Sequence, residues 1–416
     1  MPVQTTGARL QAGTGVLRGG SLNGGAPHGV NWPRPIHPFA FYAVAFASFG
    51  GPLALAALAA PNLLSDVGGS TGLAAVLSIA VFALPLGIWL RYSNQVQSSG
   101  GLFAFVEAAA GRRVALAQAG VWTASYVLYL VYTTVQIVYD LLPAAVPGER
   151  RYQTLLALLI PVAVVGVMIA GRAAALITLG AVAAGQLALV GALDGVTLAH
   201  LSTPVSSFAG GAPAGELAKA SAQSSLLYIC GSLPLFLGGE LARPRRTIRR
   251  GVTGAFVLTG LVVLLAVAPL ASAPGLLRTA IPGVTVAQEF SGQGLAEAIG
   301  IGVAVSTAGL ILLEYLALTR LLNAVGAWPT RNIAWALGAV MLIAAPLTLI
   351  DPEGLYEALL KPSLVALWIS QLIVLAVYPR FVARRRGRLL PAWGFSVAAS
   401  GLAIYGLVTA FQATGS

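Results

Sequence analysis

The chain has 416 residues, of which 57% are hydrophobic and only 9% are charged, and its net charge is +11 at pH 7. Soluble domains carry roughly 25% charged residues, so this composition excludes an ordinary soluble protein and indicates an integral membrane protein. A strongly basic chain is also typical of nucleic-acid-binding proteins, but here the basic residues follow the predicted membrane topology, and we expect no nucleic-acid partner.

At the start of the chain, residues 1–35 are rich in Gly, Thr and Gln and lack a long apolar run. This predicts a disordered cytoplasmic tail without a cleavable signal peptide. After it, apolar stretches of about 20 residues predict membrane-spanning helices. The predicted spans are residues 38–64, 71–91, 114–142, 153–170, 173–195, 217–242, 251–271, 294–320, 332–350, 362–382 and 391–413. Eleven spans are therefore expected, although a count of twelve stays open.

The basic residues predict the orientation of these spans, because Lys and Arg are enriched in cytoplasmic loops. With the N-terminus in the cytoplasm, nearly all of the 24 Lys and Arg residues lie on that side. The exceptions are Arg150, Arg151, Lys219, Arg278 and Lys361. An odd number of spans then places the C-terminus outside the cytoplasm.

The first span is interrupted at Ser48-Phe49-Gly50-Gly51, directly before Pro52. Two glycines followed by a proline favour a break in a helix. Backbone groups freed by a break cannot face lipid, so they must line an enclosed or wet cavity in which they can bind a solute. A proline can also begin a second half-helix, because the N–H that it lacks would have no partner there.

The third span carries Tyr126, Tyr129 and Tyr132 at a spacing of three residues, with Gln136 one turn further. If this span lines a cavity, the tyrosine stripe faces it. Tyr129 is nearest the middle of the span and is the predicted substrate contact. The alternative is helix packing or an aromatic belt at the membrane surface.

The sixth span contains a second interruption at Tyr228-Ile-Cys230-Gly231-Ser232, shortly before Pro234. The first and sixth spans are thus both broken, five spans apart. Interruptions at corresponding places in two halves are the sequence pointer to an inverted-repeat transporter with its site at the midplane. The alternative is that these glycines only allow helices to pack closely.

Two other features of this region limit the chemistry. Cys230 is the only cysteine of the chain, which excludes an intramolecular disulfide, and the scattered histidines give no support for a metal site or a catalytic triad. After the break, Glu240 precedes an arginine cluster from Arg243 to Arg250, and we expect the carboxylate to pair with that cluster.

The eighth span contains polar residues that suit ion coupling. Glu314 lies about six residues before Arg320. An ionisable group inside a span is a functional hypothesis by default, so Glu314 is a candidate proton carrier, unless it pairs with an arginine at the cytoplasmic end. Ser306 and Thr307 offer hydroxyl ligands for Na⁺, although helical hydroxyls usually bond back to the preceding turn.

Three segments resemble the amino acid–polyamine–organocation (APC) superfamily, in particular small bacterial permeases and exporters of neutral amino acids. The segment from Ser98 to Gly111 is similar to that family's Pro-Ser-Ala-Gly-Gly signature after the second span. The segment from Glu240 to Arg250 resembles its Glu-x-x-Asn-Pro-Arg-Arg-Thr-Ile stretch. The segment from Thr319 to Gly326 resembles its Ser-Arg-x-x-Tyr-Ala motif after the eighth span.

In this register, residues 48–51 align with the family's Gly-Ser-Gly loop and residues 228–232 with its unwound sixth-span segment. Ser232 and Leu233 stand where the family usually has an aromatic residue and an acid. The resemblance implies substrate contacts from Ser48, Phe49, Gly50, Gly51, Tyr228, Cys230, Gly231 and Ser232.

The resemblance also implies an all-α, leucine-transporter-like fold with two inverted five-helix repeats. The core would be residues 36–382, with repeats at about 38–195 and 217–382, and residues 383–416 would add one helix. In one variant of the family, the amine of a lysine in the fifth span takes the place of a sodium ion. The fifth span of this chain contains no lysine.

The expected function is secondary active transport of neutral amino acids or related small amines, without a cofactor but with possible H⁺ or Na⁺ coupling. Export or exchange of a modified amino acid or amine metabolite is the alternative. A channel or an intramembrane enzyme has less support from the sequence. We expect a multi-pass protein of a bacterial plasma membrane, as a monomer or a homodimer.

Overall fold

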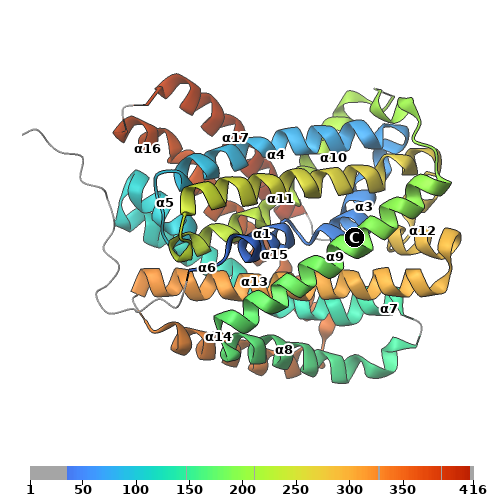
Figure 1. Ribbon diagram of the computed structural model, residues 1–416, viewed down its shortest axis with the longest axis horizontal. Helices are drawn as coiled ribbons and strands as arrows, with labels where there is room; N and C mark the ends of the chain where they lie inside the picture. Colours follow the sequence, from blue (N-terminus) through green and yellow to red (C-terminus); the bar gives the residue numbers. More distant parts are fainter. Residues whose placement is uncertain (1–34, 147, 210, 327, 386, 413–416) are drawn as a thin grey trace, which may run out of the picture. The chain divides into compact units, whose positions relative to one another are not determined.

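The computed structural model describes residues 35–412 except 147, 210, 327 and 386. The predicted cytoplasmic tail therefore lies outside the described residues, apart from Pro35. The described part of the chain is almost entirely helical (Figure 1). Its single β-type feature is a parallel bridge between Ile36 and Leu241.

Ten helical stretches of the described chain are long and apolar enough to cross a membrane. The first, Pro38–Ser93, has 56 residues, and its helix is interrupted at Gly68, where φ is 46°. At about 1.5 Å per residue, 56 residues are far longer than the roughly 30 Å of a bilayer core. This stretch therefore holds two spans, which agrees with the eleven predicted from the sequence.

In the first half of the chain the helices follow the predicted spans closely. They are α1 (Pro38–Ser48), α2 (Pro52–Ala54), α3 (Ala60–Leu64), α4 (Thr71–Ser93), α5 (Gly101–Ala110), α6 (Arg112–Val135), α7 (Leu142–Ala145), α8 (Gln153–Ala170) and α9 (Arg172–His200). A π-helical turn, Leu55–Ala59, connects α2 to α3, and another, Gln136–Leu141, connects α6 to α7.

In the second half of the chain, the broken sixth span consists of an α-helix followed by a 3₁₀ helix, and further helices come after it. The helices are α10 (Ala214–Leu226), a 3₁₀ helix (Ile229–Glu240), α11 (Pro244–Val267), α12 (Pro282–Ser291), α13 (Gln293–Gly326), α14 (Thr330–Leu347), α15 (Pro352–Ala376), α16 (Tyr378–Arg384) and α17 (Leu389–Gln412). Short 3₁₀ turns occupy Ser65–Ser70, Glu149–Tyr152, Val205–Phe208, Pro269–Ser272 and Leu276–Arg278.

The sequence prediction placed the starts of two helices too late: the seventh span was predicted to begin at residue 251, but α11 begins at Pro244. The tenth span was predicted to begin at residue 362, but α15 begins ten residues earlier, at Pro352. Asp351 caps it, because its carboxylate accepts a hydrogen bond from the Gly354 N–H at 3.0 Å. The Asp-Pro pair is thus a helix start, and the first turns of α15 are polar because they extend beyond the apolar stretch.

The long helix α13 lies at the centre of the bundle and is buried along most of its length. It packs against α6, α9, α12 and the 3₁₀ helix of the sixth span, and α1 packs between α9 and α11. Figure 1 shows α4, α11 and α13 running along the long axis of the picture, with α5 and α16 at one end and α7 and α12 at the other. The two broken spans are therefore enclosed by other helices.

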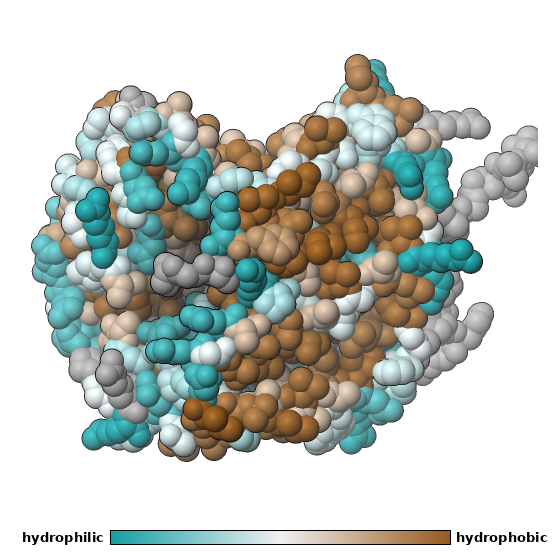
Figure 2. All heavy atoms as spheres, turned by 180° about the vertical axis from the view of Figure 1, so that it is seen from behind, coloured by the Kyte–Doolittle hydropathy of each residue, from teal (hydrophilic) through white to brown (hydrophobic). Residues whose placement is uncertain are grey.

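The outer surface of the bundle is apolar. Large aliphatic residues are strongly exposed on several helices, such as Val162 on α8, Ile177 on α9 and Ile343 on α14. Figure 2 shows a broad area of hydrophobic residues bordered on both sides by hydrophilic ones. An exposed apolar area of this extent is typical of a surface that contacts lipid.

One end of the spans gathers many arginines, and we call it the arginine-rich end. It includes Arg91 at the end of α4, Arg172 at the start of α9, Arg245 at the start of α11, Arg320 near the end of α13 and Arg385 after α16. Contacts join these positions, since Arg172 and Arg320 meet at Glu240, and Arg91, Arg245 and Arg385 line one cavity.

Helices α6 and α15 are joined by a polar seam. The Ser125 hydroxyl donates to the Ser363 carbonyl at 2.8 Å, and the Ser363 hydroxyl donates to the Ser125 carbonyl at 2.9 Å. Nearby, the Gln118 amide donates to the Ser370 hydroxyl at 3.0 Å. All four side chains are buried, so these bonds satisfy groups that would otherwise be costly to remove from water.

Candidate functional site

The first span is broken between Ser48, where α1 ends, and Pro52, where α2 begins. The intervening Gly50 and Gly51 have φ values of 69° and 66°. Residues with a side chain rarely adopt this left-handed region, so the break requires these glycines. The Ser48 hydroxyl is buried and bonds back to its own helix at 2.7 Å.

The sixth span is broken after α10, and the chain continues as a 3₁₀ helix to Glu240. This segment has 12 residues, whereas 3₁₀ runs rarely exceed three or four. The pattern of an ordinary α-helix is therefore absent through the whole second half of the span. Ser232 lies inside it, fully buried, and its hydroxyl donates to the Ile229 carbonyl at 3.2 Å.

The structure brings the two breaks into direct contact. A Cβ atom added to Gly50 would lie 2.8 Å from the carbonyl oxygen of Leu227. A Cβ atom added to Gly231 would lie 2.2 Å from the ring of Phe49. Both distances are too short for a side chain, so each glycine is needed for the close approach of the opposite break. Local sequence patterns cannot show these contacts, because the two breaks lie far apart in the chain.

Tyr228, a predicted substrate contact, packs in an aromatic cluster at the edge of the breaks. Its ring centroid lies 5.6 Å from that of Phe82 on α4 and 5.5 Å from that of Phe256 on α11. Phe49 reaches the same cluster, 5.6 Å from Phe256. This cluster connects both breaks to the flanking helices α4 and α11.

Cys230 and Glu314 form a buried polar pair beside the breaks. The Cys230 thiol donates to Glu314 Oε1 at 3.9 Å, while Glu314 Oε2 is buried without a hydrogen-bond partner in the described chain. The family usually has an acid in the sixth-span break itself. Here α13 provides a carboxyl group beside that break instead.

Within the described chain, the structure excludes one alternative for each of two predicted features, while helix packing of the tyrosine stripe stays open. Glu314 does not pair with Arg320, because the Arg320 side chain is engaged elsewhere. The tyrosine stripe of α6 does not form a surface belt, because Tyr126 and Tyr132 are buried in the bundle. Tyr129 is partly buried, and its ring lies 6.1 Å from that of Tyr126.

The predicted hydroxyl pair of α13 separates into two different environments. The Ser306 hydroxyl is fully buried without a hydrogen-bond partner in the described chain, and it faces Gly51, whose added Cβ would lie 2.3 Å from Ser306 Oγ. The Thr307 hydroxyl instead donates to the Val303 carbonyl at 2.9 Å, within its own helix. Only Ser306 therefore offers a free oxygen to the first-span break.

Sequence analysis missed Gln186 on α9. Both its amide atoms are buried without a hydrogen-bond partner in the described chain. Val182 packs against Gly309, and Leu189 against Gly302, so Gln186, on the same face of α9, comes level with Ser306. A buried amide without partners is costly, which makes this a second polar group available for a ligand. The only sequence signal was a single glutamine in an apolar helix.

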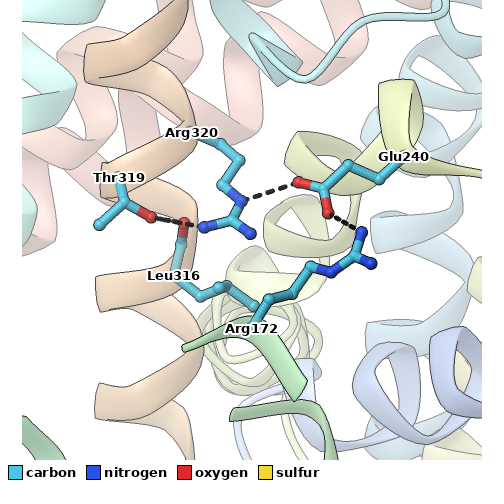
Figure 3. Close-up of polar contacts among 5 residues, drawn as sticks. All are labelled: Arg172, Glu240, Leu316, Thr319 and Arg320. Atoms are coloured by element: carbon cyan, nitrogen blue, oxygen red, sulfur yellow. Dashed lines mark hydrogen bonds and ion pairs between the residues drawn. The ribbon is translucent and has the colours of Figure 1, made fainter. Parts of the chain in front are cut away.

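Glu240 closes the arginine-rich end of the site, but its partners differ from those predicted. Its two carboxylate oxygens bind Arg172 at 2.9 Å and Arg320 at 2.8 Å, and its side chain is fully buried (Figure 3). The predicted pairing with the cluster from Arg243 to Arg250 is wrong. The chain is extended at Leu241, with φ −97° and ψ 138°, so it leaves the span there and carries that cluster onto α11.

The same residue ties down the segment before the first span. The Ile36 N–H donates to the Glu240 carbonyl at 2.9 Å, next to the bridge with Leu241. Glu240 thus joins four parts of the chain through its backbone and side chain: the segment before α1, the sixth span, α9 and α13. These contacts separate the breaks from the arginine-rich end.

No family model matches the chain, and no curated protein matches its sequence. Among solved structures, it is similar to the crystal structure of MhsT in complex with L-phenylalanine, with a TM-score of 0.60. The sequence identity is 14%, and the match covers 91% of this chain and 99% of the MhsT chain. The chain therefore has the leucine-transporter-like fold predicted from its sequence.

Proposed function

We propose that the protein is a secondary active transporter that moves a neutral amino acid or a related small amine across the membrane by alternating access. The observation that carries this function is the contact between the two broken spans, at Gly50 with Leu227 and at Phe49 with Gly231. Broken helix ends offer free N–H groups to a carboxylate and free carbonyls to an ammonium group. The L-phenylalanine bound to the structurally similar MhsT supports an amino acid.

The residues around the breaks narrow the substrate class. Those of the first and sixth spans are small or uncharged, and Glu314 is the carboxyl group in contact with them through Cys230. One carboxyl group suits a substrate with a single ammonium group better than a polyamine. Export or exchange of a modified amino acid or amine metabolite would use the same contacts and is the second candidate.

We also propose that the chain belongs to the APC superfamily and that its arginine-rich end faces the cytoplasm. The three similar segments after the second, sixth and eighth spans support the superfamily. The arginine-rich end would face the cytoplasm of a bacterial cell, because Lys and Arg are enriched there. The C-terminus would then lie outside, where a protease added to intact cells removes a C-terminal tag; protection of the tag would reverse the orientation.

Uptake of radiolabelled amino acids into proteoliposomes tests the function. A transporter gives uptake that saturates and that unlabelled substrate inhibits, and uptake that never saturates would exclude it. The single cysteine supplies an independent test of the site. Because Cys230 lies at the break, the true substrate should slow its alkylation by a maleimide, whereas equal rates with and without substrate would place the site elsewhere.

Two buried polar groups favour coupling to a cation. Glu314 lies in the interior with a single weak hydrogen-bond partner, and an ionisable group inside a span is a candidate proton carrier. Ser306 presents a free hydroxyl to the backbone of the first-span break, and hydroxyl and carbonyl oxygens suit Na⁺. Variants of each residue distinguish the two ions.

For proton coupling, we expect Glu314→Gln to abolish the response of uptake to an inward proton gradient. The amide keeps the size of the side chain but cannot release a proton. Substrate binding, measured by thermal shift, separates a lost proton response from a lost substrate contact, because the same carboxyl group is the proposed partner of the substrate ammonium. Glu297→Gln is the matched control, because Glu297 lies on the same helix but is only half-buried and accepts a hydrogen bond from the Gln293 amide at 3.0 Å. Gradient-driven uptake in Glu314→Gln equal to that of the control would exclude proton coupling through this residue.

For sodium coupling, we expect Ser306→Ala to raise the Na⁺ concentration for half-maximal uptake about tenfold, the usual cost of losing one bond to a charged group. Thr307→Ala is the control, because that hydroxyl already bonds within its helix. Sodium titrations of uptake measure both. If the two alanine variants respond alike, Ser306 is not a sodium ligand.

A further inference from the structure

A cavity of about 490 Å³ lies at the arginine-rich end, where α4, α11, α16 and α17 meet. It is separate from the broken spans and has no part in the function proposed above. Its polar lining comes from Arg91, Asn94, Gln95, Arg245, Arg385 and Arg388. Four guanidinium groups from three segments, namely α4, α11 and the connection between α16 and α17, therefore surround one concave space.

Aromatic residues hold two of these arginines in place. The Arg91 guanidinium donates to the Tyr378 hydroxyl at 3.2 Å and lies 4.5 Å from the centre of the Phe395 ring on α17. The Arg385 guanidinium lies 5.7 Å from the Phe381 ring. Tyr378 and Phe381 also line the cavity. Such contacts position a cation without neutralising it, so the site is ordered before an anion arrives.

The charge of the cavity is uncompensated. Within the described chain, none of its four arginines forms an ion pair with a carboxylate, and no acidic residue lines the space. Arg245 also borders a second hollow of about 390 Å³, lined by Arg243, Arg246 and Arg249. The enrichment of arginine on one side of a membrane protein explains why these residues are at this end. It does not explain why they converge on one cavity.

The rim of the cavity is apolar and faces outward. Pro391 and Ala392 line the space at the start of α17. Beside them, Leu390 is 85% exposed and Trp393 is 55% exposed. Exposed leucine and tryptophan at the end of a span are typical of residues at the level of lipid headgroups. A ligand that occupies both the arginine-lined cavity and its apolar rim therefore needs an anionic group and an apolar chain.

We propose that this cavity binds the phosphate headgroup of an anionic phospholipid from the leaflet at the arginine-rich end. The guanidinium groups bind the phosphate oxygens, as basic pockets between membrane helices do with anionic lipids. The acyl chains lie along the apolar first turns of α17. The lipid thereby joins α17 to α4 and α11 at the arginine-rich end.

The test uses the full-length protein in a neutral detergent. Short-chain phosphatidylglycerol is titrated in, and binding is measured by the rise in melting temperature. Short-chain phosphatidylcholine and inorganic phosphate are the comparison ligands. We expect a saturable rise with phosphatidylglycerol alone. An equal rise with phosphatidylcholine, or an equal rise with inorganic phosphate, would overturn the proposal in favour of non-specific lipid binding or a soluble anion site.

Variants show whether the cavity is responsible. Arg385→Gln and Arg388→Gln change exposed residues, and each should weaken phosphatidylglycerol binding about fivefold, the usual effect of one basic residue near an anionic lipid. Arg331→Gln is the control, because Arg331 is exposed on α14 and does not line the cavity. If the control weakens binding as much as the cavity variants do, the effect is general surface charge and the site does not exist.

Discussion

The Gly231→Leu variant should bind no amino acid and transport none. Even the first side-chain atom at this position would lie 2.2 Å from the Phe49 ring, and a leucine would have to push the two broken spans apart. Because the proposed site is made of the backbone of both breaks, their separation removes it. A thermal-shift screen against the twenty amino acids measures binding, and uptake into proteoliposomes measures transport.

Two further variants make this result specific. Gly191→Leu is the matched control, because Gly191 is exposed on α9 and nothing lies within 4 Å of an added Cβ; it should bind and transport as the unmodified protein does. Combining Gly231→Ala with Phe49→Ala removes the ring that causes the clash, and should have a higher melting temperature than Gly231→Ala alone. A ligand that stabilises Gly231→Leu as strongly as the unmodified chain would refute the proposed site.

Replacing Glu240 should open the arginine-rich end. Glu240→Ala leaves Arg172 and Arg320 without their shared carboxylate, and removal of one partner from a buried ion pair costs about 3–5 kcal/mol. Since alternating access requires this end to open, we expect the loss to favour the open form as well as to lower stability. The rate of Cys230 alkylation by a reagent confined to the arginine-rich side should then rise several-fold.

The control for this result is a surface ion pair at the same end. Glu107 pairs with Arg112 at 3.3 Å, but the two side chains are 39% and 57% exposed, and such pairs contribute about 0–1 kcal/mol. Glu107→Ala should therefore leave both the melting temperature and the alkylation rate nearly unchanged. If Glu240→Ala behaves in the same way, the buried network does not hold this end closed.

The sequence predicted the parts of the fold that depend on local patterns. Apolar stretches located the spans, and the Gly-Pro interruptions located both breaks to within a few residues. The short helices α5 and α12 were not predicted, because they are too short to give a membrane-span signal. The start of α15 was misplaced because polar residues beyond the apolar stretch were taken to lie outside the helix.

Predictions about side-chain partners depended on how far apart the partners are in the sequence. The expected pairing of Glu240 with its nearest arginines was wrong, since the extended backbone after it turns the chain away and distant arginines from α9 and α13 reach it instead. The contact of Cys230 with Glu314 spans 84 residues, and no local pattern indicates it. The acid that seemed to be missing from the sixth-span break therefore became visible only when the helices were packed together.

The polar seam between α6 and α15 bears on how the molecule can move. Two serines that exchange hydrogen bonds at 2.8 and 2.9 Å fix both the rotation and the sliding of one helix against the other, because any shift along the axis breaks both bonds at once. We therefore expect α6 and α15 to move as one rigid body throughout a transport cycle. A pair of spectroscopic labels on these two helices should keep a constant separation, and would serve as the fixed reference against which the broken spans are seen to tilt.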